Sequence, residues 1–304
     1  MKKLLLPLLA LAICCSSLHA QYYFYNDRYY ENAVVVELGG SFGVMNSLTD
    51  LGGKKGVGKG FIKDLRWKTA TPTGSVHVTG MYKNAIAARL ELTFGSVKGF
   101  DSILKNVSSL FTGRYERNLS FKSKIMELQL AAEIHPLYIL KFDPDNPPPV
   151  SPYAVVGIGY FNFNPQANLD GQWINLQPLH TEGQGFREYR DRQPYKLSQF
   201  NITAGMGVKY ELNSFANLRL EVLHRFLNTD YLDDVSTTYI DPSLFDKYLS
   251  PNLAYFAAQL NNRKRELNPA DETMPGEKRG DPKGNDAFFT IQLKIGVVIG
   301  RQRR

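Results

Sequence analysis

The chain has 304 residues, of which 36 are Lys or Arg and 29 are Asp or Glu, so its formal net charge is +7. Part of the basic surplus is the tail Arg301, Arg303 and Arg304, and no basic stripe is interleaved with aromatic residues, which excludes nucleic acid as a partner. Cys14 and Cys15 both fall within the first twenty residues. Without them, the remaining chain can form neither a disulfide-stapled scaffold nor a thiol site.

The first twenty residues, MKKLLLPLLALAICCSSLHA, predict a secretory signal peptide. Lys2 and Lys3 form its basic start, Leu4–Ile13 its apolar run, and Ala20 ends a plausible cleavage site. The apolar run is too short to span a bilayer. A lipid anchor at Cys14 is the minor alternative, because a bulky isoleucine directly precedes that cysteine. We therefore expect an exported protein whose folded domain covers residues 21–304.

Eight segments of the exported part alternate apolar and polar residues with period two, which predicts β-strands. The first is Ala33–Met45, where Val34, Val36 and Leu38 share one side and Glu37 lies on the other. The others are Gly74–Tyr82, Ala85–Phe94, Lys124–His135, Pro152–Phe163, Gln199–Glu211, Asn217–Phe226 and Asp286–Gly300. In the fifth segment the alternation changes phase at Tyr160-Phe161, which predicts a bulge there or the end of the strand.

The connections between these segments are alternately long and short. The long ones are Asn46–Thr73, Gly95–Lys122, Asn164–Lys196 and Asn228–Asn285, and the short ones contain Lys83-Asn84, Asp143–Pro149 and Leu212–Ala216. An even number of strands with short turns at one end and long loops at the other is typical of outer-membrane barrels. We expect an all-β fold, an eight-stranded antiparallel transmembrane β-barrel with periplasmic termini and long extracellular loops that contain short helices.

Charged residues recur on the side of the strands opposite the apolar stripe. Inside a narrow barrel these charges would pair with one another, whereas in a soluble sandwich or lipocalin-like barrel, the alternative fold, they would face solvent. The predicted lumen network consists of Glu37, Arg89, Glu91, Glu127, Glu133, Lys209, Arg219, Glu221 and Lys294. Because eight strands enclose little more than side chains, we do not expect a transport pore.

No set of residues in the sequence predicts a catalytic centre, a metal site or a cofactor site. Gly53–Gly60 imitates a phosphate-binding loop but has glycine where the magnesium-binding Ser or Thr belongs, so a surface loop is the better interpretation. His77 and His135 are interpreted as lumen residues, and His224 as a residue near the membrane interface. A lipid-modifying enzyme that uses His77 or His135 is the weaker interpretation.

The longest connection, about 228–285, holds several aspartates. Asp230, Asp233, Asp234 and Asp241 could bind calcium, but aspartates more often cap turns, and we expect the second role. Asp241-Pro242 predicts the start of a helix, and Leu253, Phe256, Ala257 and Leu260 follow at helical spacing. Ala270–Asn285 is rich in charges and prolines, which predicts disorder.

Three stretches of the sequence resemble the PorG-like family of outer-membrane barrels, which belongs to the type IX secretion machinery of Bacteroidota. They are ELGGSFGVMNSLTDLGG (Glu37–Gly53), GRYERNLSFKSKIMEL (Gly113–Leu128) and TDYLDDVSTTYID (Thr229–Asp241), in matching order. The third is the most specific, and it contains the motif residues Asp230, Tyr231, Asp233 and Asp234.

This resemblance implies a non-enzymatic protein without cofactor or small-molecule substrate. Members of the family sit in the lipid of the outer membrane and associate with a periplasmic ring of the PorK and PorN proteins. The candidate partner surface would then be periplasmic, at Lys83, Asn84, Asp143, Asp145 and Asn213. A surface adhesin or protective barrel, with its function in the outer loops, is the competing interpretation.

Overall fold

The computed structural model describes residues 33–51, 68–104, 113–140 and 148–299. The signal peptide, the stretch Gly53–Gly60, the two aspartates Asp143 and Asp145, and the C-terminal arginines therefore lie outside the described residues. None of the described helices is long and apolar enough to cross a membrane.

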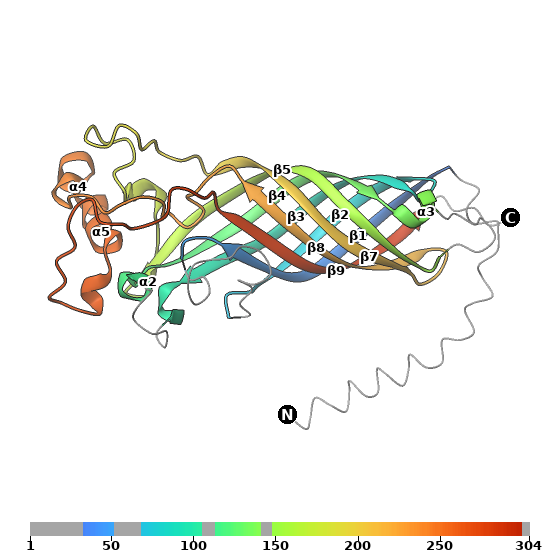
Figure 1. The fold of residues 1–304 in the computed structure, drawn as a ribbon, viewed down its shortest axis with the longest axis horizontal. Coiled ribbons are helices and arrows are strands. Elements are labelled where there is room, and N and C mark those ends of the chain that lie inside the picture. The colour runs from blue at the N-terminus through green and yellow to red at the C-terminus, as the bar shows by residue number, and fades with distance from the viewer. Residues whose placement is uncertain (1–32, 52–67, 105–112, 141–147, 300–304) are drawn as a thin grey trace, which may run out of the picture.

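The described residues form one antiparallel sheet that closes on itself (Figure 1). Its eight barrel strands are β1 (Val34–Leu48), β2 (Thr71–Tyr82), β3 (Ile86–Phe100), β4 (Ser120–Ile134), β5 (Val150–Leu169), β7 (Ser198–Glu211), β8 (Ala216–Leu227) and β9 (Ala287–Ile299). Each strand pairs with its neighbours in the chain, β1 pairs with β9, and the β4–β5 pairing completes the ring. The short strand β6 (Gln172–Asn175) only extends β5 as a hairpin. All eight sequence-predicted strands are present, and the barrel fold is confirmed.

The outward face of the barrel is an apolar belt. Large side chains on it are well exposed, for example Phe42 at 64%, Ile158 at 57% and Met206 at 70%. On β5 the outward residues run from Val150 to Tyr160, which is ten residue intervals of about 3.3 Å each along a strand tilted by roughly 40°. The belt is therefore about 25 Å tall, the height of the apolar band of outer-membrane barrels.

Aromatic residues border this belt on both sides. Phe42, Phe94, Tyr160, Phe200 and Phe226 are exposed at the margin nearer the long loops, and Tyr82, Tyr210 and Phe215 at the margin nearer the short turns. Aromatic rings prefer the boundary between hydrocarbon and water, so the two girdles mark where a bilayer would begin and end. A soluble barrel has no reason to expose such a belt, and the soluble alternative is thereby excluded.

The expected irregularity at Tyr160-Phe161 is wrong. The pairing of β5 with β4 and β7 runs without interruption through both residues, so the strand has no bulge there. What changes is the surroundings. Beyond Tyr160 the outward residue Asn162 is exposed, whereas Phe161 and Phe163 are fully buried inside. The strand has passed out of the belt, and its polarity inverts because water replaces lipid outside.

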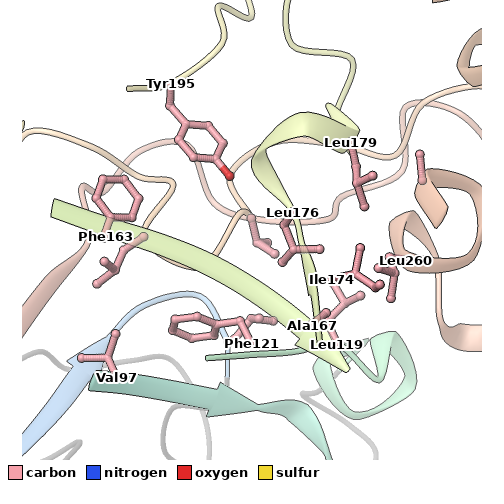
Figure 2. Packing of buried hydrophobic residues seen from close by; sticks show 14 of the residues in the cluster. Val97, Leu119, Phe121, Phe163, Ala167, Ile174, Leu176, Leu179, Tyr195 and Leu260 are labelled. Atoms are coloured by element: carbon pink, nitrogen blue, oxygen red, sulfur yellow. The ribbon is translucent and has the colours of Figure 1, made fainter. Parts of the chain in front are cut away.

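The described parts of the long loops form a cap over one end of the barrel, which we call the loop cap (Figure 1). It contains η4 (Asp101–Leu104), α2 (Gly113–Arg117), η6 (Gln177–Leu179), α4 (Ser243–Tyr248), α5 (Pro251–Asn261) and η7 (Lys264–Glu266). Figure 2 shows its apolar core, where Phe121 and Phe163 from the strands meet Leu176, Leu179 and Leu260 from the loops. The cap therefore shares one hydrophobic core with the strand ends that carry the long loops.

Two sequence predictions about the longest loop have different outcomes. The helices are confirmed: α4 begins at Ser243, whose N–H donates to the Asp241 carboxylate at 2.9 Å, and Ala257 and Leu260 on α5 are buried. The predicted disorder of Ala270–Asn285 is wrong. Arg279, within that stretch, is 2% exposed, and its segment forms a β-bridge between Thr238 and Lys278.

The opposite end of the barrel, which we call the turn end, carries the start of β1, the end of β9 and the short turns. Lys83 and Asn84 both have positive φ, 50° and 55°, as the tight hairpin between β2 and β3 requires. The turn between β4 and β5 contains a short helix, α3 (Pro136–Leu140), which the sequence analysis did not foresee. Between β7 and β8, the Asn213 side chain accepts hydrogen bonds from the N–H groups of Phe215 and Ala216, both at 2.9 Å.

Candidate functional site

The barrel interior holds a continuous network of ion pairs. All nine predicted lumen residues lie there and are at most 2% exposed. Arg219 bridges Glu37 at 2.5 Å and Glu133 at 2.8 Å. Glu133 continues to Arg89 at 2.8 Å, and Arg89 also contacts Glu221 at 2.7 Å and Glu91 at 3.1 Å.

Lys294 closes this network on its far side. Its ammonium group contacts Glu91 at 2.5 Å and Glu221 at 2.9 Å. Four carboxylates thus share three cations, and each carboxylate has at least one cation in direct contact. Such alternation is what a charge needs in order to be buried, because an unpaired one would cost several kcal/mol in desolvation.

Two further pairs flank the network. Lys209 contacts Glu211 at 2.9 Å, and the Glu127 carboxylate accepts a hydrogen bond from Arg225 Nε at 3.1 Å. Glu211 and Arg225 were not among the predicted network residues, although both alternate onto the same strand face as their partners. Neutral residues complete the contacts and were missed: Tyr153 donates to Glu221 at 2.9 Å, and Asn217 donates to Glu37 at 2.7 Å. No charge pattern in a sequence identifies such neutral donors.

The histidines are bound into the same interior. His77 contacts Glu37 at 3.3 Å, and His135 lies 3.4 Å from Glu133 and 3.3 Å from the Ser151 hydroxyl. Both are buried, as expected of lumen residues. His224 is on the outward face of β8 near the loop cap, where it is only 8% exposed and its ring centroid is 4.3 Å from that of Phe226.

The interior is filled rather than hollow. The five long cations of the network and its flanks, Arg89, Lys209, Arg219, Arg225 and Lys294, are all at most 1% exposed. Close packing also explains a glycine: a Cβ at Gly207 would lie 2.4 Å from the ring of Tyr153, so only glycine leaves room for that ring. The described interior is therefore occupied by packed side chains whose charges are paired.

A second buried network holds the loop cap together, and the motif Thr229–Asp241 forms its centre. The Glu182 carboxylate accepts hydrogen bonds from the N–H groups of Ser236 and Thr237, at 3.0 and 2.9 Å, and from Arg279 at 2.8 Å. Arg279 also donates to the backbone carbonyl of Asp234 at 2.6 Å. The motif therefore specifies how the loops fold against one another. Glu182 and Arg279 were missed because nothing in their local sequence marks them.

The motif aspartates are structural acceptors. Asp233 accepts from the N–H groups of Leu51 and Val235, both at 3.0 Å, and Asp234 accepts from the Tyr195 hydroxyl at 2.7 Å. Burial raises the pKa of Asp234 to about 6, although the guanidinium of Arg279 lowers it in part. Burial, with the nearby charge of Asp50, raises the pKa of Asp233 well above its usual range.

The other two motif residues are half-buried in the cap. Tyr231 stacks on Tyr195, with ring centroids 5.0 Å apart. One oxygen of the Asp230 carboxylate is buried without a partner, and burial raises the pKa of Asp230 to about 7. In the part of the chain that the structure describes, no group of three or more acidic or histidine side chains is arranged to hold a metal ion.

The predicted partner surface at the turn end is only partly exposed. Lys83 and Asn213 point to solvent, but Asn84 is 4% exposed and belongs to the packing of its hairpin. Asn84 is therefore a poor contact residue, because its side chain is buried. The exposed residues that the sequence analysis missed there are apolar, Ile139 and Leu140 on α3 and Phe215 on the next turn, at 53%, 78% and 54%.

Comparison with known proteins gives a likeness in fold. No family model matches the chain, and no curated protein does. Among solved structures, the chain is similar to Ail, the attachment invasion locus protein of Yersinia pestis, with 8% identity and a TM-score of 0.35 over 88% of this chain and 97% of that one. It is also similar to Neisserial surface protein A (8%, 0.38, with 88% and 97% covered) and to the outer membrane protein OprG of Pseudomonas aeruginosa (11%, 0.35, with 90% and 99% covered). These values are low, so the assignment of this chain as a membrane barrel rests on its own strand ring and apolar belt.

Proposed function

We propose that this protein is a non-enzymatic outer-membrane component of the type IX secretion machinery of Bacteroidota, which anchors or positions a periplasmic ring of the PorK and PorN type. The loop cap would face outward, and the turn end with both termini would face the periplasm. One observation carries the non-enzymatic, anchoring role: the barrel is filled by a paired charge network. A barrel filled in this way would act through its surfaces.

The assignment to the secretion machinery rests on the resemblance of Glu37–Gly53, Gly113–Leu128 and Thr229–Asp241 to the PorG-like family. The contacts of these stretches indicate a structural reason for the resemblance. The described parts of all three stretches enter the packing between strands and loop cap, where Leu51 bonds to Asp233 and Leu119 and Phe121 join the shared core. Stretches that set the fold of the cap are those whose sequence we expect the members of such a family to share.

The turn end supplies a surface on which a periplasmic partner could rest. Ile139, Leu140 and Phe215 expose apolar area at the end of the belt, and Lys83 adds a cation held over the Tyr82 ring at 5.4 Å. A mixed patch of exposed apolar residues and a charge is typical of a protein interface. The expected contact is therefore with residues at this end.

The experiment is a mild-detergent pull-down of the tagged full chain from outer membranes of the native host, with partners identified by mass spectrometry. Ring proteins are expected to co-purify, and deletion of the gene is expected to abolish export of secreted cargo. Lys83→Glu with Leu140→Ser should reduce the recovered ring proteins, while the matched cap variant Lys196→Glu should not. Normal export in the deletion strain would refute the proposal.

A surface adhesin or protective barrel is the second candidate, because the loop cap is an ordered structure that extends beyond the belt. Burial of Phe245 and Leu260 within it shows that the loops hold a fixed surface. Shortening the segment 243–261 would then remove host or ligand attachment and leave export intact. The reverse pattern favours the secretion role.

A further inference from the structure

The loop cap contains a cavity of about 280 Å³ that lies beside its buried network and shares Arg279 with it. Three loops contribute to its wall: the one after β1, the one that contains α2, and the long one after β8. The lining residues are Asp50, Arg114, Glu116, Arg117, Tyr239, Lys264, Lys278, Arg279, Gly280 and Asp281. Five cations against three carboxylates make this wall basic.

The floor of the cavity is rigid. Arg117 donates to both oxygens of Asp101, at 2.9 and 3.0 Å, and to the backbone carbonyl of Asp50 at 2.8 Å. Arg279 is held by Glu182 at 2.8 Å and by the carbonyl of Asn261 at 3.1 Å. Both guanidinium groups are buried and each is already paired with a carboxylate, so they give the floor a fixed shape, and the lysines of the wall are left to meet a ligand.

One polar group in the wall lacks a partner. Tyr239 is 1% exposed, and its hydroxyl is buried without any hydrogen-bond partner. Buried hydroxyls almost always have a partner, so an orphan beside a cavity points to one supplied from outside. The ammonium group of Lys264 lies over the same ring, 5.0 Å from its centre, so the ring with the orphan hydroxyl has a cation on its face.

Within the described residues, the two lysines of the wall, Lys264 and Lys278, are paired only with exposed carboxylates. Lys278 is 70% exposed on its side chain and its contact with Asp281 is 3.6 Å long, while Lys264 pairs with the exposed Glu277 at 3.1 Å. Two acids of the wall are occupied or remote, while the third, Asp281, is 53% exposed on its side chain and pairs with Lys278. Asp50 accepts the N–H of Asp281 at 2.5 Å, and Glu116 faces solvent. An incoming anion would therefore compete with the exposed Asp281 for Lys278 and with the exposed Glu277 for Lys264.

We propose that this cavity binds the phosphate or sulfate ester of a saccharide-sized ligand, with the Tyr239 hydroxyl donating to the ester oxyanion and Lys264 and Lys278 closing over it. Basic side chains and hydroxyl donors are the usual partners of such oxyanions. The volume is just below that of pockets for drug-sized ligands, which suits one sugar ring with its charged group. The site is independent of the partner at the turn end.

The test is isothermal titration calorimetry on the full chain in a neutral detergent without phosphate, with glucose 6-phosphate, glucose 6-sulfate and glucose as probes. Saturable binding of either ester, with a Kd below about 1 mM, and none of glucose is expected. To find the source of the group, the chain is placed in lipid discs with either phosphorylated or phosphatase-treated lipid A. Competition by the phosphorylated form alone supports the site with a membrane glycolipid as ligand; no competition supports it with a soluble one.

Two variants tie binding to the cavity. Tyr239→Phe removes only a hydroxyl that bonds to nothing, so the fold should be retained, and affinity should fall about tenfold through loss of one hydrogen bond to a charged group. Lys278→Met should weaken binding at least as much, whereas Lys196→Met, an exposed lysine of the cap outside the cavity, should not. Absence of saturable ester binding, equal binding of glucose, or full affinity in Tyr239→Phe would overturn the proposal.

Discussion

Arg89→Met tests whether the interior network stabilises the barrel through charge balance. Arg89 is fully buried and contacts Glu91, Glu133 and Glu221 at 3.1, 2.8 and 2.7 Å. After its removal every one of these acids still has a cation in contact: Lys294 remains for Glu91 and Glu221, and Arg219 remains for Glu133. The cost is therefore that of one uncompensated buried charge, about 3–5 kcal/mol, rather than three times that figure.

The charge-balanced double variant Arg89→Met/Glu221→Gln separates charge from packing. Removing one acid with the cation restores the balance, so we expect the double variant to recover at least about 2 kcal/mol relative to the sum of the single variants, as interacting pairs do. The free energy of unfolding would be measured by urea titration in detergent micelles with far-UV circular dichroism. Lys124→Met, on the outward face of β4 above the belt, is the control and should stay near the parent. A loss under about 1 kcal/mol for Arg89→Met, or strict additivity in the double variant, would refute the reasoning.

Three further variants probe the belt and the cap. Ile158→Arg places a charge in the belt and should cost about 2–4 kcal/mol of barrel stability in lipid vesicles, whereas Asn162→Arg, two outward positions further, should cost little because it faces water. Glu182→Ala removes the carboxylate that pairs with the buried Arg279 guanidinium, which destabilises the cap. The cap should therefore become sensitive to limited proteolysis, while the β-sheet signal in circular dichroism persists. Protease resistance equal to that of the parent would contradict this. Burial raises the pKa of Asp230 from 3.8 to about 7, so its ionisation costs cap stability as pH rises from about 4 to 7, by about 2 kcal/mol after allowance for its partial exposure. Asp230→Asn should remove the share that Asp230 contributes and leave the share of Asp233 and Asp234, whose pKa values are also raised, and hydrogen exchange of residues 229–241 at pH 5 and pH 8 measures the difference.

Alternation with period two was enough to predict every barrel strand. In a membrane barrel each residue faces either lipid or a narrow interior, so local sequence reports the environment directly. For the same reason the nine lumen charges were found from their side of the strand. Their pairing was beyond reach, because Arg219 and Glu133 are 86 residues apart and meet only when the ring closes.

The errors arose where the environment changes along the chain. At Phe161 the strand leaves the belt, and the inverted polarity of its two faces imitates a bulge. In Ala270–Asn285 the composition predicts disorder, but Arg279 is ordered by Glu182, which lies 97 residues earlier. The local sequence pattern reports neither the change from lipid to water around a strand nor a hydrogen-bond acceptor that is distant in the sequence.

The sequence alone therefore determined the number of strands, the faces of the barrel wall and the alternation of turns and loops, since each depends on neighbours within a few residues. The tertiary structure alone decided how the interior acids are neutralised, that the loops form a cap with its own core, and that a basic cavity with an unbonded tyrosine hydroxyl lies within that cap. These features depend on contacts between segments that only closure of the barrel brings together.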